Sequence, residues 1–263
     1  MILDRFKLTD KVAIVTGAGK GIGKGTAIAL GEAGADVVCA ARTATDLDAT
    51  ADAVRATGRR ALPVATDVLE RAQLEALVAT AVAEFGKVDI LVNNAGGWPP
   101  RPALRTSEDG FEQALKFNVV SPFLLTRFVV PVMVETAGGG AVVNISSRAA
   151  SMVQPMFTAY GTAKAGLSFM TRNLAPELAP KVRINAIEVG GVETDALASV
   201  LTDDSVRRQM EDNTPMRRVG QVEDIAAGVV YLASPAASWI TGKVFEIDGG
   251  VEHPSFTVPF EPL

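Results

Sequence analysis

The chain alternates between short apolar stretches and longer amphipathic ones along almost its whole length. The apolar stretches are rich in β-branched residues and have the length of strands. We expect strands at Lys11–Thr16, Asp36–Ala41, Ala61–Ala65, Val88–Val92, Ala141–Ile145, Val182–Ile187 and Val244–Ile247. We expect helices at Gly21–Ala33, Thr45–Thr57, Glu70–Phe85, Ser107–Thr136, Thr158–Leu178 and Glu223–Ala233. The fourth of these helices should bend near Pro122, because proline disrupts helical hydrogen bonding.

The order of these elements predicts the fold class. Strands that alternate with helices are typical of parallel sheets joined by helical crossovers. The predicted strands are apolar throughout, so helices should cover both faces of the sheet. We therefore expect one α/β domain over residues 1–263, with a Rossmann-type, doubly wound sheet of seven parallel strands.

Two segments interrupt this alternation. Residues 192–218 form a long, charged insertion between a strand and a helix. Because long insertions in compact folds are usually functional, we expect a substrate-binding insertion there. The C-terminal tail, residues 252–263, holds Pro254, Pro259 and Pro262. We expect this tail to be either loose or extended over a neighbouring subunit.

Composition and charge exclude several classes of protein. The formal charge of −5 leaves no basic face for nucleic acid. The single cysteine, Cys39, excludes an internal disulfide and cysteine-rich zinc sites, so we expect no metal. A lone buried cysteine is typical of a reducing compartment. No stretch has the pattern of a signal peptide or about 18 consecutive apolar residues, so we expect a cytoplasmic protein without a membrane partner.

Glycines follow the first predicted strand in the spacing TGxxxGxG, through Thr16, Gly17, Gly21 and Gly23. Glycines between a strand and a helix let backbone amides approach a pyrophosphate, and the helix N-terminus favours negative charge. The common spacing GxGxxG is absent, and a flexible turn would also be rich in glycine. The position directly after the first strand favours a dinucleotide site.

The end of the second predicted strand indicates which dinucleotide binds. NAD-binding folds place an acidic residue there to bind the ribose 2′-hydroxyl. This chain has Ala41 at that point, followed by Arg42, and Lys20 lies in the glycine turn. Two cations without a carboxylate favour a 2′-phosphate, so we expect NADP(H), with NAD(H) the less favoured alternative. Arg42 could instead begin a solvated loop, and we expect Asp46 and Asp48, further along the chain, to cap the next helix.

Several motifs together resemble the short-chain dehydrogenase/reductase family over nearly the whole chain. They are the glycine turn Thr16–Gly23, the run Asn93-Asn94-Ala95-Gly96, Asn118, Ser147, and the pair Tyr160 and Lys164. The resemblance implies that Asn118, Ser147, Tyr160 and Lys164 are catalytic, with Asn118 helping to hold a water that links Lys164 to solvent. It also implies a homotetramer, with Ser107–Thr136 and Thr158–Leu178 at one interface. The cofactor-binding residues it implies, together with those argued above, are Gly17, Lys20, Gly21, Ile22, Gly23, Arg42, Asp67, Val68, Asn94, Ala95, Gly96, Tyr160, Lys164, Gly190, Val192 and Thr194.

One stretch departs from the family pattern. Val189 stands where the family usually has a proline before Gly190, and Gly191 follows. Glu188 and Glu193 are unusual there, and we expect them to be solvated or ion-paired.

The spacing of Tyr160 and Lys164 suits acid–base chemistry. Residues at i and i+4 share one helix face. A free tyrosine has a pKa of about 10, which is too high for an effective base near neutrality. An ammonium at about 4 Å is worth roughly 4 kcal/mol at an effective dielectric of 20, so we expect Lys164 to lower the pKa of Tyr160. Ser147 would then hydrogen-bond the substrate oxygen as its charge changes; the neighbouring Ser146 is an alternative donor.

The substrate is the part that the sequence indicates least. The residues expected near the pocket are mainly apolar, which suits a bulky hydrophobic carbonyl or secondary alcohol. Three stretches are similar to bacterial 7α-hydroxysteroid dehydrogenases: Val88–Gly97, Thr214–Gln221 and Ser234–Gly242. A 3-oxoacyl thioester reductase, an NAD-dependent hydroxysteroid dehydrogenase and a catalytically silent nucleotide-binding regulator stay open as alternatives. The expected pocket residues are Gly97, Trp98, Gln154 and Phe157, with Pro99, Met152, Val153 and Met156 nearby.

Overall fold

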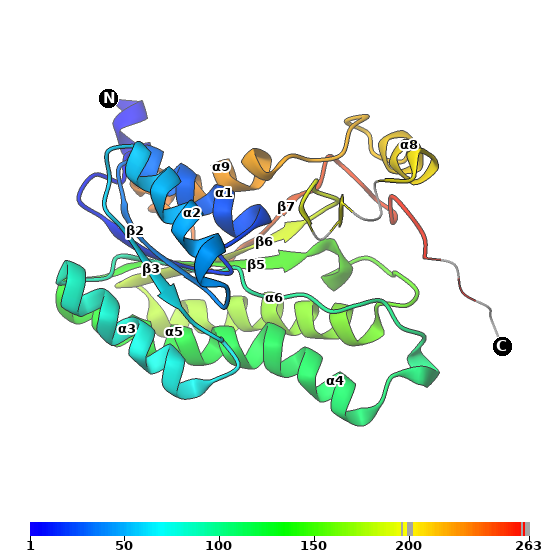
Figure 1. Ribbon diagram of the computed structural model, residues 1–263, viewed down its shortest axis with the longest axis horizontal. Coiled ribbons are helices and arrows are strands. Elements are labelled where there is room, and N and C mark those ends of the chain that lie inside the picture. Colours follow the sequence, from blue (N-terminus) through cyan, green and yellow to red (C-terminus); the bar gives the residue numbers. More distant parts are fainter. Residues whose placement is uncertain (196, 199–201, 259, 261–263) are drawn as a thin grey trace.

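The computed structural model describes residues 1–195, 197–198, 202–258 and 260, and these build one parallel sheet covered by helices (Figure 1). The strand order is β3-β2-β1-β4-β5-β6-β7, and every pairing is parallel. This confirms the predicted seven-stranded, doubly wound Rossmann-type sheet. The strands are β1 (Val12–Thr16), β2 (Asp36–Ala41), β3 (Ala61–Ala65), β4 (Ile90–Asn93), β5 (Gly140–Ser147), β6 (Val182–Val189) and β7 (Val244–Ile247).

Helices cover both faces of the sheet (Figure 1). One face carries α1 (Gly21–Glu32), α2 (Ala44–Ala56) and α9 (Val222–Ala233), and the other carries α3 (Arg71–Phe85), α5 (Ser121–Ala137) and α6 (Thr158–Leu178). Short 3-10 turns lie at Ile2–Phe6, Ala103–Arg105, Arg148–Ala150 and Pro235–Ala237.

Successive strand residues enter two separate cores. On β1, Ala13 and Val15 pack with α1, α2 and α9, whereas Ile14 packs with α3 and α5. Since neighbouring side chains on a strand point to opposite faces, a strand buried on both faces must be apolar at every position. Cys39 on β2 is fully buried in the first core, where burial raises the pKa of its thiol to about 12. It is therefore a structural residue.

Strands β5 and β6 run two residues further than predicted. They pair from Gly140 opposite Val182 to Ser147 opposite Val189. Three of the four residues added at the strand ends, Ser146, Ser147 and Glu188, are polar or charged, and such residues are less typical of strands than apolar ones. Pairing along the full length brings Ser147 and Val189 to the same edge of the sheet.

The predicted helix Ser107–Thr136 is divided into two. Helix α4 (Glu108–Leu115) is followed by a π-helical turn (Lys116–Val120), and α5 begins directly afterwards with Pro122 in its first turn. In place of the predicted bend near Pro122, the structure has this π-helical turn, which directly precedes the first turn of α5 and its proline. By length and hydropathy alone, the run Glu108–Ala137 could cross a membrane, which is weak evidence for a membrane span, and its residues Leu125, Val129 and Met133 are buried against the sheet.

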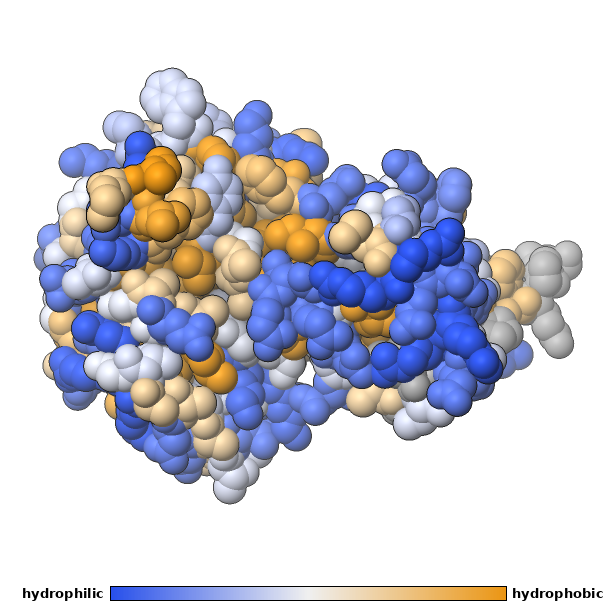
Figure 2. Space-filling model, turned by 90° about the horizontal axis from the view of Figure 1, so that it is seen from above, coloured by the Kyte–Doolittle hydropathy of each residue, from blue (hydrophilic) through white to orange (hydrophobic). Residues whose placement is uncertain are grey.

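The insertion and the tail lie together beyond the carboxyl edge of the sheet. Helix α8 (Asp204–Asp212) is capped by Asp203, whose side chain accepts a hydrogen bond from the Ser205 amide at 2.8 Å. The surface over α8 is mainly hydrophilic (Figure 2). Beneath it, Met210 and Val219 are buried, and Phe256 of the tail packs against them. The described part of the tail thus folds onto its own chain, which neither sequence-based alternative anticipated; residues 259 and 261–263 lie outside the described residues.

Candidate active site

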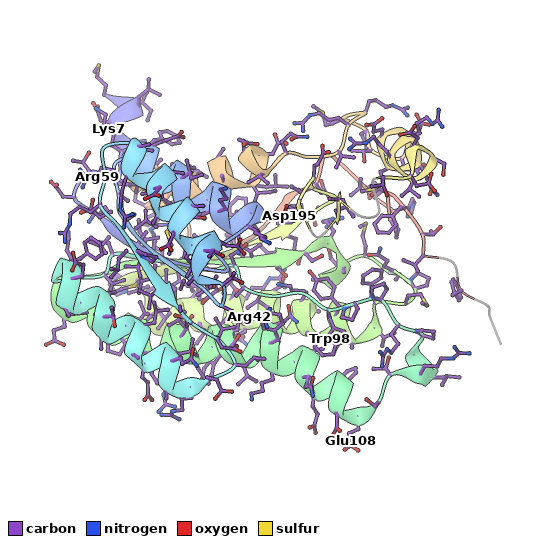
Figure 3. All side chains as sticks on the ribbon, viewed as in Figure 1. Lys7, Arg42, Arg59, Trp98, Glu108 and Asp195 are labelled. Carbon is purple, nitrogen blue, oxygen red and sulfur yellow. The ribbon has the colours of Figure 1, made fainter. Side chains whose placement is uncertain are left out.

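A cleft of about 1010 Å³ opens along the carboxyl edge of the sheet. Arg42, Trp98 and Asp195 lie around this edge, whereas Lys7 and Arg59 lie at the opposite end of the molecule (Figure 3). In doubly wound sheets, ligands bind at this edge because the chain reverses its winding direction there. All sixteen residues that the sequence suggests for cofactor binding line the cleft.

The glycine turn after β1 is fixed against β4. The Asn94 side chain donates to the carbonyls of Thr16 and Gly17, at 2.9 and 3.3 Å, and the Thr16 hydroxyl accepts from the Asn94 amide at 3.0 Å. A side chain on Gly23 would collide with the Gly17 carbonyl, at 2.2 Å from its Cβ. Only glycine at this position therefore lets the first turn of α1 pack this closely against the glycine turn.

Helix α1 points its N-terminus into the same cleft. Its N-cap, Lys20, makes no side-chain capping bond, so the first amides of the helix remain available to a ligand. Free amides and the positive end of the helix dipole together fit a pyrophosphate. This cradle therefore fits a dinucleotide.

The end of the cleft at β2 contains cations and one carboxylate. Arg42 is exposed and forms no ion pair within the described part of the chain. Lys20, however, lies 3.4 Å from a carboxylate oxygen of Asp46, which also lines the cleft. The sequence interpretation placed Asp46 at a helix cap, but α2 begins at Ala44 without a side-chain cap. Asp46 is thus a residue of this end of the cleft that the sequence missed.

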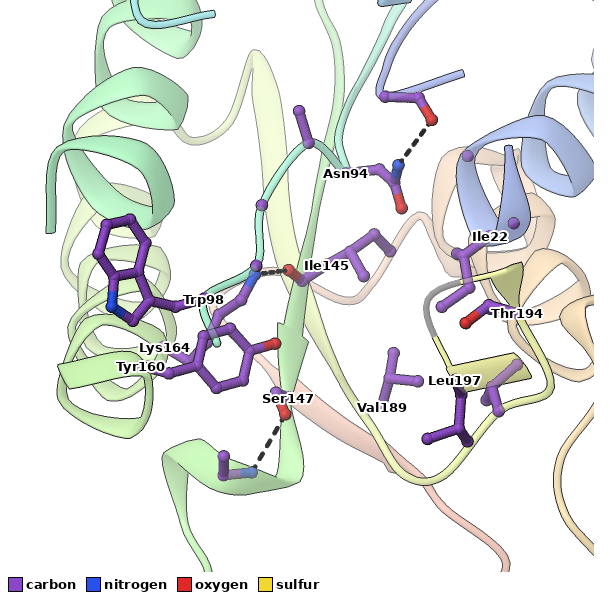
Figure 4. A pocket seen from close by; sticks show the side chains of 18 of the residues that line it. Ile22, Asn94, Trp98, Ile145, Ser147, Tyr160, Lys164, Val189, Thr194 and Leu197 are labelled. Atoms are coloured by element: carbon purple, nitrogen blue, oxygen red, sulfur yellow. Dashed lines mark hydrogen bonds between the residues drawn. The ribbon is translucent and has the colours of Figure 1, made fainter. Parts of the chain in front are cut away.

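Ser147, Tyr160 and Lys164 meet on one side of the cleft, facing Ile22, Thr194 and Leu197 across it (Figure 4). Ser147 ends β5, whereas Tyr160 and Lys164 occupy the first two turns of α6. The Lys164 ammonium donates to the Ile145 carbonyl at 2.8 Å and lies 5.8 Å from the centre of the Tyr160 ring.

The pKa directions differ from the sequence expectation. Burial raises the pKa of Tyr160 above its ordinary value of 10.0, and a hydrogen bond with Ser147 acts in the opposite direction. Lys164 is nearly fully buried, and burial lowers its pKa from 10.5 to about 8. The expected lowering of the Tyr160 pKa by Lys164 is therefore wrong for this structure, because desolvation of the phenol outweighs the other effects.

Asn118 lies in the π-helical turn, below the cleft, and is fully buried. Its side chain donates to the carbonyls of Gly97 and Ala114, at 3.1 and 2.9 Å, and accepts from the Gly97 amide at 2.9 Å. The Asn118 amide is thus occupied in holding Gly97, which precedes Trp98. A Cβ on Gly96 would lie 2.8 Å from Asn118 Oδ1 and 3.0 Å from Lys164 Nζ, so these three residues share one small region.

The two adjacent serines of β5 have different surroundings. Ser146 is buried, donates to the Lys164 carbonyl at 3.1 Å and lies 2.9 Å from the Ser168 hydroxyl. The Ser147 hydroxyl faces the cleft beside Tyr160 and accepts a hydrogen bond from the Ala149 amide at 3.2 Å. Of the two, Ser147 is the one free to bind a substrate oxygen.

Comparison with known proteins gives the family. Residues 17–252 match the family model described as enoyl-(acyl carrier protein) reductase. The chain belongs to the short-chain dehydrogenase/reductase family. It is 49% identical to an uncharacterised oxidoreductase of Mycobacterium tuberculosis over the full length of both chains. It is 42% identical to the 7α-hydroxysteroid dehydrogenase of Escherichia coli K12, over 94% of this chain and 96% of the relative.

A solved structure of the same family has a closely similar fold. It is a 7α-hydroxysteroid dehydrogenase in complex with NADH and 7-oxo glycochenodeoxycholic acid, with a TM-score of 0.91 and 40% identity. The match covers 96% of this chain and 98% of that one. This short-chain dehydrogenase/reductase is therefore an oxidoreductase of a family that uses a nicotinamide cofactor and acts on alcohols and ketones.

The substrate end of the cleft in this short-chain dehydrogenase/reductase is lined by residues that the sequence predicted and by others that it did not. The four expected pocket residues, Gly97, Trp98, Gln154 and Phe157, line the cleft together with Met152 and Pro99. Val153 is 90% exposed, and neither it nor Met156 lines the cleft. Leu197, in the predicted substrate-binding insertion, also lines the cleft, whereas the sequence missed the contribution of Val251 and of the tail residues Pro254, Ser255, Phe256 and Val258.

The two unusual glutamates have different partners. Glu193 is paired with Arg207 at 2.6 Å, which lowers the pKa of Glu193. Glu188 is only 3% exposed and accepts hydrogen bonds from Ser151 and Ser168, at 2.6 and 2.8 Å. Its carboxylate also lies 3.6 Å from the Arg148 guanidinium, so Glu188 is ion-paired, as expected, within a buried polar cluster.

Proposed function

We propose that the protein is an NADP(H)-dependent oxidoreductase that transfers a hydride between the nicotinamide and a carbonyl or secondary alcohol on a hydrophobic substrate. The observation that carries this proposal is the continuity of one cleft. The cleft runs from the free N-terminus of α1, past the Ser147 and Tyr160 hydroxyls, into an apolar pocket.

The chemistry follows from the residues at the middle of the cleft. When bound, the nicotinamide supplies or accepts the hydride. In reduction, Tyr160 Oη donates its proton to the carbonyl oxygen, and Ser147 Oγ holds the same oxygen by a hydrogen bond. Because burial raises the pKa of Tyr160, the phenol keeps its proton at neutral pH, which suits a general acid. In the opposite direction the phenol must first lose that proton, so alkaline pH favours oxidation.

The preference for NADP(H) rests on the β2 end of the cleft. Ala41 offers no carboxylate to a ribose 2′-hydroxyl, and Arg42 stands next to it without an ion-pair partner in the described chain. A guanidinium can bind a phosphate through two hydrogen bonds. Asp46 is the one observation in favour of NAD(H), because its carboxylate lies in the same region and pairs with Lys20.

We propose a steroid-like ketone or alcohol as the first substrate class. The wall of the pocket combines Trp98, Phe157, Leu197 and Phe256 with few polar groups, which suits a large, rigid apolar molecule. The relative that is 42% identical acts on such a molecule, according to its name.

The test is a screen of purified protein with NADPH or NADH against three sets of substrates: steroid ketones, 3-oxoacyl thioesters and quinones. We expect turnover with NADPH and at least one steroid ketone. Turnover with 3-oxoacyl thioesters alone would identify the protein as a 3-oxoacyl thioester reductase instead. Tight dinucleotide binding without turnover on any of them would favour the catalytically silent regulator.

We also propose a cytoplasmic homotetramer. Helices α5 and α6 expose large apolar side chains, with Phe123 40% and Phe169 61% exposed in the single chain. Such side chains gain from burial against another subunit. Light scattering after size-exclusion chromatography should give four times the mass of the 27.5 kDa chain.

A further inference from the structure

Arg148, the residue after Ser147, has an unusual number of partners for a side chain that is only 9% exposed. Its guanidinium lies 2.8 Å from Asp248, 2.5 Å from Glu246 and 3.6 Å from Glu188. It also donates to the Ser151 hydroxyl at 2.9 Å and to the Val251 carbonyl at 3.2 Å. One cation thus joins the ends of β5, β6 and β7 and the residue that precedes the tail.

On one side, these contacts lead to the catalytic helix. The Glu188 carboxylate, which faces Arg148, accepts a hydrogen bond from Ser168 on α6 at 2.8 Å. The Ser168 hydroxyl lies 2.9 Å from that of Ser146, which in turn donates to the Lys164 carbonyl at 3.1 Å. The chain of contacts therefore sets how α6, with Tyr160 and Lys164, sits against β5.

On the other side, the contacts lead to the backbone at the end of β6. Asp248 accepts a hydrogen bond from the Gly250 amide at 2.8 Å, while its other oxygen faces Arg148. A Cβ on Gly190 would lie 2.7 Å from the Asp248 Cα, so the Asp248 turn rests directly against Gly190. Holding Asp248 therefore holds the Val189–Gly190 segment, which lines the cleft beside Ser147 on the neighbouring strand.

We propose that Arg148 is a positioning residue that fixes the cleft wall at Val189–Gly190 relative to Ser147, Tyr160 and Lys164. The inference rests on the proposed function, because this wall would contact the nicotinamide. Val189 lacks a proline ring that would restrain the backbone there. The guanidinium provides the restraint instead, and its planar fork of donors can hold several acceptors at once, which an ammonium cannot do in the same geometry.

The test compares two ligands that differ only in the nicotinamide. Arg148→Lys keeps the charge and loses the fork. Because it leaves buried acceptors unpaired beside the wall, we expect it to raise the Kd of NADPH about tenfold. The Kd of 2′-phospho-ADP-ribose, which has no nicotinamide, should change less than about twofold. Glu188→Gln, a milder change of the same cluster, should alter the ratio of the two Kd values in the same direction.

Arg183→Lys is the matched control. Arg183 lies at the other end of β6 and donates to the carbonyls of Leu232 and Ser234, at 2.8 and 3.2 Å. Arg183→Lys should lower the melting temperature of the protein and leave the ratio of the Kd values of NADPH and 2′-phospho-ADP-ribose unchanged. If Arg148→Lys raises the Kd of both ligands equally, Arg148 has a general structural role and the inference is overturned. If Arg148→Lys does not fold, an unchanged ratio of the two Kd values in Glu188→Gln overturns it instead.

The proposed function can fail separately. If the unmodified protein binds NADH rather than NADPH, the same comparison is made with NADH and ADP-ribose, and only the cofactor preference is wrong. If it binds neither dinucleotide, the proposed function and this inference both fail.

Discussion

The ammonium of Lys164 donates a hydrogen bond to the carbonyl of Ile145, on the strand that ends in Ser147. This contact ties the catalytic helix α6 to β5 and keeps a charged group in a site that is only 3% exposed. Burial of the ammonium has an energetic cost, which is visible in the lowered pKa of about 8.

The cost should appear in the pH dependence of stability. The folded pKa of Lys164 lies below 10.5, so the unfolded chain binds more protons between about pH 8 and pH 10.5. The contribution of Lys164 to the free energy of unfolding should therefore rise by roughly 3 kcal/mol across this window. Urea denaturation at several pH values should show this rise in the unmodified protein and not in Lys164→Met. Lys181→Met, which removes an exposed lysine, should follow the unmodified protein; parallel profiles for all three would contradict the prediction.

Tyr160→Phe should remove the acid–base group without disturbing the fold. Because general acid–base catalysis contributes about 10²- to 10⁴-fold, kcat should fall by that factor. The Kd of the dinucleotide should stay within about threefold. The other tyrosine, Tyr231, stacks on Phe6 outside the cleft, so Tyr231→Phe is the control and should keep full activity. Full turnover in Tyr160→Phe would refute the mechanism.

Arg42→Ala should reduce the preference for NADPH. It removes the proposed phosphate ligand, so the Kd of NADPH should rise about tenfold while that of NADH stays the same. Arg60, which pairs with Glu84 at the opposite end of β3, provides the control Arg60→Ala. Equal affinities for both dinucleotides in the unmodified protein would rule out the preference.

Asp46→Asn separates the two cofactor hypotheses. The substitution frees Lys20 from its carboxylate partner, so NADPH should bind a few-fold more tightly if a 2′-phosphate lies there. If Asp46 instead binds a ribose hydroxyl, NADH affinity should fall with no gain for NADPH. Isothermal titration with both dinucleotides decides between these results.

Asn118→Leu should loosen the loop that carries Trp98. It leaves the amide and carbonyl of Gly97 without their partner, which should cost about 2 kcal/mol of unfolding free energy and raise the KM for the substrate. Asn185 is a buried asparagine that similarly bridges Ile240 and Lys243 away from the cleft. Asn185→Leu should lower stability comparably and leave KM unchanged; the same KM in both variants would be evidence against this role of Asn118.

Phe256→Ala should widen the substrate pocket. The ring packs on Met210 and Val219 and lines the cleft, so its loss should raise the KM for a bulky substrate about tenfold. Phe260, in the same tail, is 51% exposed, and Phe260→Ala should have no such effect. Unchanged kinetics in Phe256→Ala would show that the tail does not form part of the pocket.

The sequence by itself determined the order of elements and the fold. Apolar runs such as Val12–Thr16 can be buried on both faces only in a covered parallel sheet, so local pattern and architecture agree. The glycine turn, and the i, i+4 spacing of Tyr160 and Lys164, were also visible, because these depend on neighbours close along the chain.

The tertiary structure decided whatever depends on partners far apart in sequence. The pKa of Tyr160 is raised because the fold buries the phenol, which no spacing along the chain reveals. Glu188 faces Arg148 and Ser168 only because β5 and β6 pair to their full length against α6. Likewise, the tail joins the pocket through the contact of Phe256 with Met210. Burial and long-range pairing arise only when distant segments pack together, so a linear pattern could predict where the reaction takes place but not the environment in which it occurs.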